Sequence, residues 1–298
     1  MSIRKRMGKL KNIVISGTDI CDFADSTSDF GFELRILAML KALTVKCEHS
    51  GTYDDPVTQR PRQFDIRALL DFELYRVRLA IECKNLRENF PLVVFEVPRN
   101  EMESFHDLIL SYQPQRNGSF VHSSVMDSHG KKLRLRNKCS FYPPNEYVGK
   151  ACSQVGRLLN DDLTGNDAEV YDKWYQAIHS AHDLVDRANE DWKTNDKKVC
   201  VTLVLPILVV PNDRLWRIKY QSDGMRDNNP ERIDRATMYI DKFVASTDRL
   251  AGISASFSHL EIVTERGLAN LCNGFLTGDF VAKAFPNEGI QSALPESD

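Results

Sequence analysis

The sequence predicts an α/β protein, a three-layer α/β/α sandwich in which helices cover both faces of a central mixed sheet. Three observations lead to this fold class. Short segments that alternate apolar and polar residues recur along the 298 residues, a pattern typical of half-buried strands. Between them lie segments whose apolar residues fall at helical spacing. Strands and helices therefore alternate in chain order, which favours the three-layer arrangement.

The first elements in chain order are a helix and a β-hairpin. Apolar residues at helical spacing from Gly31 to Leu43 predict an amphipathic helix, and a strand over 45–49 would open the sheet. Residues 63–72 and 74–83 then alternate apolar and polar side chains on either side of a short polar turn. An antiparallel hairpin is the simplest arrangement of two such runs.

The later elements follow from shorter patterns. Leu92–Val97 is predicted to be a central strand that Pro98 ends. Residues 199–210 are predicted to form a buried strand, in which Pro206 indicates an edge, a bulge or two shorter strands, and 215–220 is the predicted hairpin partner. The pattern also predicts helices over 101–112, 147–159, 168–192 and 265–275, a strand over 260–263, and either a strand or a helix over 234–245.

The chain is predicted to form one elaborated domain over residues 1–285. Its core spans about 28–112, and added helices and strands occupy 147–285. Residues 114–144 are polar, basic and rich in turn residues, which indicates an insertion. The tail over 286–298 has little to bury, so it is predicted to be disordered.

Two carboxylates and a lysine lie on the polar face of the predicted hairpin. If its loop is centred on Glu73 and Leu74, Asp65 lies directly across from Glu82. A register two residues away would leave the two as diagonal neighbours. Lys84 follows on the same face of its strand. Carboxylates are ligands that Mg²⁺ prefers, typically one or two together with water and phosphate, so these residues indicate a cation site.

These residues resemble the signature of a known family. Asp65, followed by Glu82-Cys83-Lys84 at the end of an apolar strand, resembles the PD-(D/E)xK motif of the restriction-endonuclease-like nuclease superfamily. The segment Ile81-Glu82-Cys83-Lys84 is similar to its Mrr-type branch, and Phe64 stands where the motif has proline. The likeness covers roughly the first third of the chain well. It implies a restriction-endonuclease-like fold and metal-dependent hydrolysis of phosphodiester bonds, usually in DNA.

The resemblance also implies roles for individual residues. Asp65 and Glu82 would bind Mg²⁺ or Mn²⁺, and Lys84 would position or deprotonate the attacking water and offset charge on the phosphorus. Deprotonation requires a lowered pKa, so positioning is the favoured role of Lys84. The superfamily often adds an acidic residue from the first helix, for which Glu33 is the candidate metal ligand. Some members place a glutamine or basic residue on a later helix facing the metal, and Gln154 is the auxiliary candidate.

Each of these residues has a structural alternative. Asp65, Glu82 and Lys84 could form a surface salt-bridge ladder, although the apolar flanking runs favour a covered hairpin in which unpaired carboxylates are costly. Glu33 also suits the positive end of a helix. Gln154 could simply face solvent.

Charge, cysteines and hydropathy limit the function classes. The net charge is −3, yet residues 131–138 alternate basic and apolar side chains, as an arm lying along a phosphate backbone would. The candidates for nucleic-acid binding there are Lys131, Lys132, Arg134 and Arg136, with the guarding of an edge strand as the alternative. Seven scattered cysteines without a Cys-x-x-Cys pair argue against zinc and favour a reduced, cytoplasmic setting. No apolar run is long enough to span a bilayer, so no membrane partner is expected.

These features together predict a Mg-dependent endodeoxyribonuclease with a restriction or host-defence role, in which 114–144 recognises the target. The expected partners are DNA, a second copy of the chain for double-strand cleavage, and defence-system proteins. One alternative is a catalytically inactive relative that binds nucleic acid or protein. Another is a small-molecule α/β enzyme, which no glycine-rich nucleotide loop or Gly-x-Ser-x-Gly elbow supports.

Overall fold

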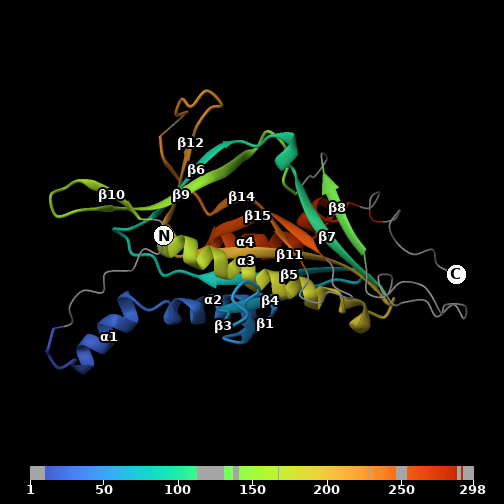
Figure 1. Ribbon diagram of the computed structural model, residues 1–298, viewed down its shortest axis with the longest axis horizontal. Coiled ribbons are helices and arrows are strands. Elements are labelled where there is room, and N and C mark those ends of the chain that lie inside the picture. The colour runs from blue at the N-terminus through green and yellow to red at the C-terminus, as the bar shows by residue number, and fades with distance from the viewer. Residues whose placement is uncertain are drawn as a thin grey trace, which may run out of the picture.

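The computed structural model describes residues 11–112, 131–136, 141–166, 168–227, 229–245, 254–286 and 290. That part of the chain is a mixed α/β structure with five α-helices, a thirteen-stranded mixed sheet and a separate two-stranded sheet (Figure 1). The helices are α1 (Gly17–Ser26), α2 (Phe30–Ala42), α3 (Ala168–Ala188), α4 (Glu265–Leu276) and α5 (Asp279–Ala284). The large sheet contains β1 (Lys46–His49), β4 (Ile66–Asp71), β5 (Tyr75–Cys83), β6 (Leu92–Pro98), β7 (Phe105–Tyr112), β8 (Lys131–Arg136), β9 (Tyr147–Arg157), β10 (Leu163–Asn166), β11 (Val199–Val210), β12 (Leu215–Lys219), β13 (Glu231–Arg232), β14 (Arg235–Val244) and β15 (Ala255–Thr264). The small sheet pairs β2 (Thr52–Asp54) with β3 (Pro61–Gln63).

The large sheet runs in the order β1-β4-β5-β11-β15-β14-β9-β6-β12-β13. Strand β4 is antiparallel to β1 and β5, whereas β11 is parallel to both β5 and β15. Figure 1 shows β6, β9 and β12 rising above β5, β11 and α3. The mixed sheet of an α/β protein is therefore confirmed.

The predicted hairpin forms as β4 and β5. Ile66 pairs with Ile81 and Asp71 with Arg76, so the turn is centred on Glu73 and Leu74. The helix predicted from Gly31 to Leu43 is α2, and the predicted opening strand is β1 at the edge of the sheet. The alternation of apolar and polar residues predicted this hairpin correctly because one of its faces packs on an apolar core and the other carries charged side chains.

Helices pack on both faces of the sheet around this hairpin. The odd-numbered residues of β5 and β11 join one core cluster with Phe32, Ile36 and Leu40 of α2 and with α4. The opposite face contacts α3, whose buried side chains join Ala80, Val204 and Leu208 in a second cluster. Each fully buried large apolar side chain contributes about 1.5–3 kcal/mol. The polar face of the hairpin is thus covered by α3 rather than by water.

Pro206 lies in a continuous central strand, not at an edge, a bulge or a break. Strand β11 pairs along one side with β5, and along the other first with β7 up to Leu203 and then with β15 from Ile207. The N–H of Val201 donates toward β5, so the even-numbered residues direct their backbone groups to the other side. Pro206 is even-numbered and lies between the last β7 pair and the first β15 pair. Its missing N–H therefore costs no ladder hydrogen bond.

Two predicted helices are strands instead. Residues 101–112 form a short 3-10 helix (Glu101–Glu103) followed by β7, and 147–159 form β9. Strand β7 is buried on both faces, so it lacks the alternation that identifies a half-buried strand. In β9, a Cβ at Gly149 would overlap the side chains of Met238 and Val94, so this glycine marks a close approach of neighbouring strands.

The remaining elements match the sequence to differing degrees. Strand β12 pairs with β6 and β13, so its predicted pairing with β11 is wrong. Residues 234–245, left open between strand and helix, form β14, and the predicted strand 260–263 is part of the longer β15. Helix α3 ends at Ala188 and is followed by a 3-10 helix over Asp191–Thr194.

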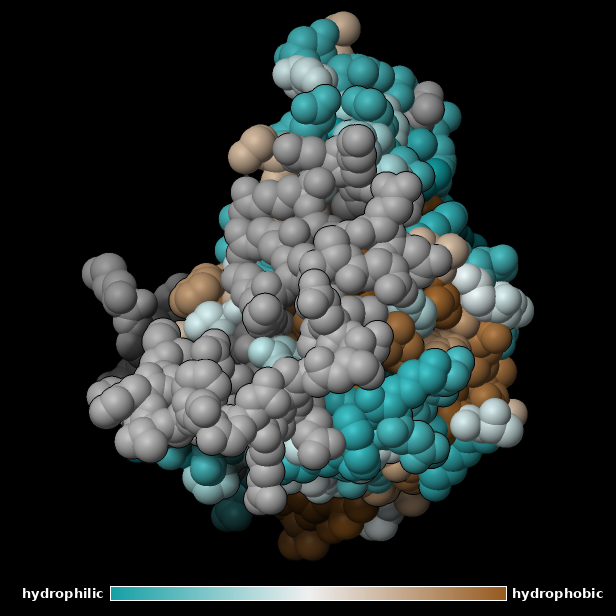
Figure 2. Space-filling view, turned by 90° about the vertical axis from the view of Figure 1, so that its right-hand side faces the viewer, coloured by the Kyte–Doolittle hydropathy of each residue, from teal (hydrophilic) through white to brown (hydrophobic). Residues whose placement is uncertain are grey.

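Parts of the predicted insertion and tail lie outside the described residues. Within 114–144, the strand β8 and residues 141–144 are described, and of the tail only 286 and 290 are. Figure 2 views the molecule from the side where β7 and β8 lie, where hydrophilic and hydrophobic residues gather in separate areas. Among the helices that the structure describes, none is long and apolar enough to cross a membrane.

Candidate active site

The two carboxylates of the motif face each other across the hairpin. Because Ile66 pairs with Ile81, Asp65 lies opposite Glu82. The backbone N–H of Asp65 donates to Glu82 Oε1 at 3.4 Å, and the N–H of Cys83 donates to Asp65 Oδ2 at 2.8 Å. Each carboxylate is thus held by the backbone of the partner strand.

The pair is buried, which excludes a solvated salt-bridge ladder at these two positions. Glu82 is 0% exposed and Asp65 is 9% exposed. Burial raises the pKa of Glu82 well above its usual value, and the negative charge of Asp65 raises it further. Two carboxylates that share a buried site need a cation to offset their charge.

Lys173, on α3, supplies that positive charge. Its ammonium Nζ lies 2.8 Å from Asp65 Oδ2 and 3.4 Å from Glu82 Oε2. Burial alone would lower the pKa of Lys173, but Asp65 and Glu82 together raise it above its usual value. The lysine therefore stays protonated over the physiological pH range.

Arginines on the hairpin hold α3 in place above the carboxylates. Arg67 Nη1 of β4 donates to Asp183 Oδ2 of α3 at 2.7 Å, and its Nε donates to Ser180 Oγ at 3.2 Å. Arg76 Nη1 of β5 donates to Asp191 Oδ1 at 3.0 Å, just beyond the end of α3. The charged face of the hairpin can be buried because each of these arginines is paired.

Lys173 was not among the residues that the motif indicated. The helix that carries it was predicted, and its buried residues include Val170, Trp174 and Ala177. At 3.6 residues per turn, Lys173 falls within this apolar stripe. A lysine among core-facing positions was the signal that could have identified it.

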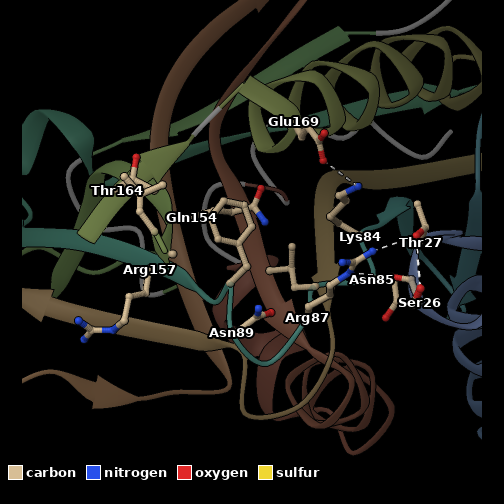
Figure 3. A pocket seen from close by; sticks show the side chains of 14 residues that line it. Ser26, Thr27, Lys84, Asn85, Arg87, Asn89, Gln154, Arg157, Thr164 and Glu169 are labelled. Carbon is tan, nitrogen blue, oxygen red and sulfur yellow. Dashed lines mark hydrogen bonds and ion pairs between the residues drawn. The ribbon is translucent and has the colours of Figure 1, made fainter. Parts of the chain in front are cut away.

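Lys84 lies apart from the carboxylate pair to which the motif assigned it. Its Nζ is 3.6 Å from Asp29 Oδ2 and 3.3 Å from Glu169 Oε2 (Figure 3). Its ion pairs are thus with Asp29 and the first turn of α3, not with Asp65 or Glu82. The ammonium nearest the pair belongs to Lys173.

Glu33 occupies the first turn of α2, as its structural alternative required. Its carboxylate Oε2 lies 3.4 Å from His49 Nε2. Burial raises the pKa of Glu33, and the charge of Asp65 adds to that rise. Glu33 is therefore close enough for the charge of Asp65 to affect its pKa, but its described ion pair is with His49.

Gln154 is a strand residue, so its predicted place on a helix is wrong, as is its solvent-facing alternative. It lies in β9 opposite Leu92 of β6 and Asn166 of β10. The residue is 2% exposed and lines a pocket beside Lys84 (Figure 3).

The basic stretch 131–136 forms strand β8, which pairs antiparallel with β7 in the described part of the sheet. Lys131 pairs with Leu110 and Arg136 with Phe105 through the backbone. Both predicted roles, an arm along phosphates and a guarded edge strand, need such an extended segment.

The donor set of the carboxylate pair fits a divalent cation. Asp65 and Glu82 offer carboxylate oxygens on facing strands, and the positively charged Lys173 ammonium already lies between them. In the described ranges, no group of three or more Asp, Glu, His or Cys residues could hold a metal ion. An ion held here would take two protein carboxylates and complete its coordination with water or phosphate, as Mg²⁺ commonly does.

Comparisons of the chain with protein-family models, curated proteins and solved structures found no match. The residues and geometry of this site therefore carry the functional inference.

Proposed function

We propose that this chain is a metal-dependent endonuclease that hydrolyses phosphodiester bonds in DNA, with a three-layer restriction-endonuclease-like fold. The observation that supports it most is the buried pair Asp65 and Glu82, facing each other with an ammonium 2.8 and 3.4 Å away. Packing alone gives no reason to bury two carboxylates and a lysine together. The helices on both faces of the β4–β5 hairpin support the fold.

In the proposed mechanism, Asp65 and Glu82 would hold Mg²⁺ or Mn²⁺. The ion would supply Lewis-acid stabilisation of the phosphate charge and activation of the attacking water. An ion held there would take the position that the Lys173 ammonium now occupies, and the flexible Lys173 side chain would then offer a positive charge at the edge of the site. Because its pKa is raised, Lys173 acts as a cation that offsets charge on the phosphate, not as a base. Lys84 would orient water or phosphate from the end of β5.

The proposal extends to partners and setting. A second copy of the chain would place two sites on a duplex, one for each strand. The exposed apolar residues Ile20 and Phe23 of α1 support such a contact, because both are 60% exposed. A cytoplasmic restriction or defence role, with further defence proteins as partners, completes the proposal.

The decisive experiment is plasmid cleavage with Mg²⁺ or Mn²⁺. We expect the native chain to cleave, and Asp65→Asn and Glu82→Ala to be inactive. Glu73→Ala, in the exposed turn of the same hairpin, is the matched control and should cleave normally. Cleavage that survives in Glu82→Ala would refute the site.

The second candidate function is an inactive relative that binds nucleic acid. The ion pair with Lys173 supports this alternative, because Lys173 already offsets the charge of the carboxylates without a metal ion. Nucleic-acid binding that is independent of metal, with no cleavage by the native chain, would support this alternative.

A further inference from the structure

A polar pocket lies beside the proposed active site, at the end of β5. It has a volume of about 450 Å³ and is lined by the 84–90 segment, by β9 and β10, and by the first turn of α3. Pockets that bind small organic groups typically span about 300–1,000 Å³. Lys84 lines it and directly follows β5, the strand whose Glu82 belongs to the carboxylate pair.

The most informative residue of the pocket is Gln154. Its side chain is buried, and among the described residues its amide oxygen Oε1 has no hydrogen-bond partner. A buried acceptor without a donor is costly, since its hydration is not replaced. Figure 3 shows Gln154 in the middle of the group of pocket side chains, between Thr164 and Lys84. A ligand that brings a hydrogen-bond donor would satisfy this oxygen once the amide rotates toward the pocket.

The other side chains of the pocket define the chemistry of that ligand. Three cations line it, Lys84, Arg87 and Arg157, against one acid, Glu169. Phe90 contributes an aromatic ring, which rests against Gly156 so closely that a Cβ there would come within 2.6 Å of it. An amide, an aromatic ring and a surplus of positive charge together suit a flat heterocycle attached to a phosphate.

We propose that this pocket binds one unpaired nucleobase of the nucleic-acid strand, through Gln154. The inference rests on the proposed function for its assumption that the ligand is nucleic acid. The base donates a hydrogen bond to Gln154 Oε1 and lies against the Phe90 ring. Arg87 lies near its phosphates. A strand whose base enters here passes the end of β5, where the carboxylates lie.

An unpaired base explains features that a bound metal or a paired duplex would not. A metal site would use carboxylates, and Glu169 is the single acid in the lining. A paired base keeps its donors engaged with its partner, whereas an unpaired base has its Watson–Crick edge available to an amide. The pocket thus assigns the enzyme a preference for substrates with bulged, mismatched or extruded bases.

The test measures binding by the full-length chain in EDTA, where no cleavage takes place. The ligands are the four deoxynucleoside monophosphates, a DNA duplex with one bulged nucleotide, and the same duplex fully paired. We expect the bulged duplex to bind at least tenfold more tightly than the paired one. Gln154→Leu should abolish this preference, while Gln221→Leu, at an exposed position, should keep it.

One further measurement and one further variant separate this role from a structural one. Gln154→Leu should leave the melting temperature unchanged or higher, because it removes an unpartnered buried amide. Gly156→Ala should weaken bulge binding by displacing Phe90. A lower melting temperature with an unchanged bulge preference in Gln154→Leu would overturn the proposal. So would binding of monophosphates without any preference for the bulge, which would assign the pocket to a free nucleotide.

The outcome is separable from that of the nuclease proposal. Asp65→Asn should keep the bulge preference, since Asp65 does not line the pocket. If the native chain fails to cleave plasmid but binds the bulge through Gln154, the pocket stands and the nuclease proposal fails. If it cleaves plasmid and binds both duplexes equally, this inference fails alone.

Discussion

Replacing Lys173 with methionine tests the electrostatic account of the site. The change keeps the length of the side chain but removes the ammonium that lies 2.8 Å from Asp65 and 3.4 Å from Glu82. It leaves two buried carboxylates without a cation. Breaking a buried ion pair in this way costs about 3–5 kcal/mol of unfolding free energy.

The matched control is Lys193→Met. Lys193 pairs with Glu190 at the surface, where the side chains are 51% and 60% exposed. Such exposed pairs contribute about 0–1 kcal/mol. Urea denaturation of the native chain and both variants at neutral pH therefore gives a direct comparison.

The deficit of Lys173→Met should depend on pH. The pKa of Glu82 is raised in the folded state, so its contribution to stability is full below its unfolded pKa of about 4.3 and is lost as pH rises through the folded value. Removing the ammonium raises the folded pKa of Glu82 further. The variant should thus lose least stability at acidic pH and progressively more toward pH 8. A deficit no larger than that of Lys193→Met, or one that shrinks as pH rises, would show that Lys173 does not offset the charge of the buried carboxylates.

Three further predictions concern ligands and assembly. Calorimetry should show tighter Mg²⁺ binding to Lys173→Met than to the native chain, because the competing ammonium is gone. The Mg²⁺ affinity should also rise with pH, as Glu82 loses its proton. Weaker Mg²⁺ binding by the variant would contradict the cation site. Changing Lys131, Lys132, Arg134 and Arg136 to glutamine should weaken DNA binding and make the slope of log K against log salt concentration less steep, by about 0.9 for each phosphate that β8 no longer neutralises. A slope equal to that of Lys193→Gln would mean that β8 does not touch phosphate. Introducing Ile20→Asp with Phe23→Asp should convert a dimer to a monomer in light scattering, and an unchanged mass would exclude α1 from the dimer interface.

The hairpin and its register were predictable because their signal is local. Strands β4 and β5 are joined by a short turn, and α2 and α3 cover opposite faces that differ in polarity. The alternation of apolar and polar residues therefore predicted both the two strands and the opposed positions of Asp65 and Glu82. The sequences of β7 and β9 do not show this alternation clearly, because β7 is buried on both faces and glycines lie within β9.

The composition of the site could be predicted only in part. Asp65 and Glu82 are near in sequence, whereas Lys173 reaches them from a helix over a hundred residues away from Asp65 along the chain, docked by Arg67. The spacing of residues within a short motif cannot predict such a distant contact. Lys84 has the right spacing, but Asp29 and Glu169 draw its ammonium away.

The parallel pairing of β5 with β11 has a consequence for biosynthesis. Val77 lies beside Leu203, which is 126 positions later in the chain (203 − 77). While the ribosome is still making the segment between them, Asp65 and Glu82 have already emerged, yet the helix and strand that enclose them do not exist. Contacts between such distant segments form late and slowly. A nascent chain thus carries both acids in an open hairpin, and the enclosed site appears only once synthesis has passed β11.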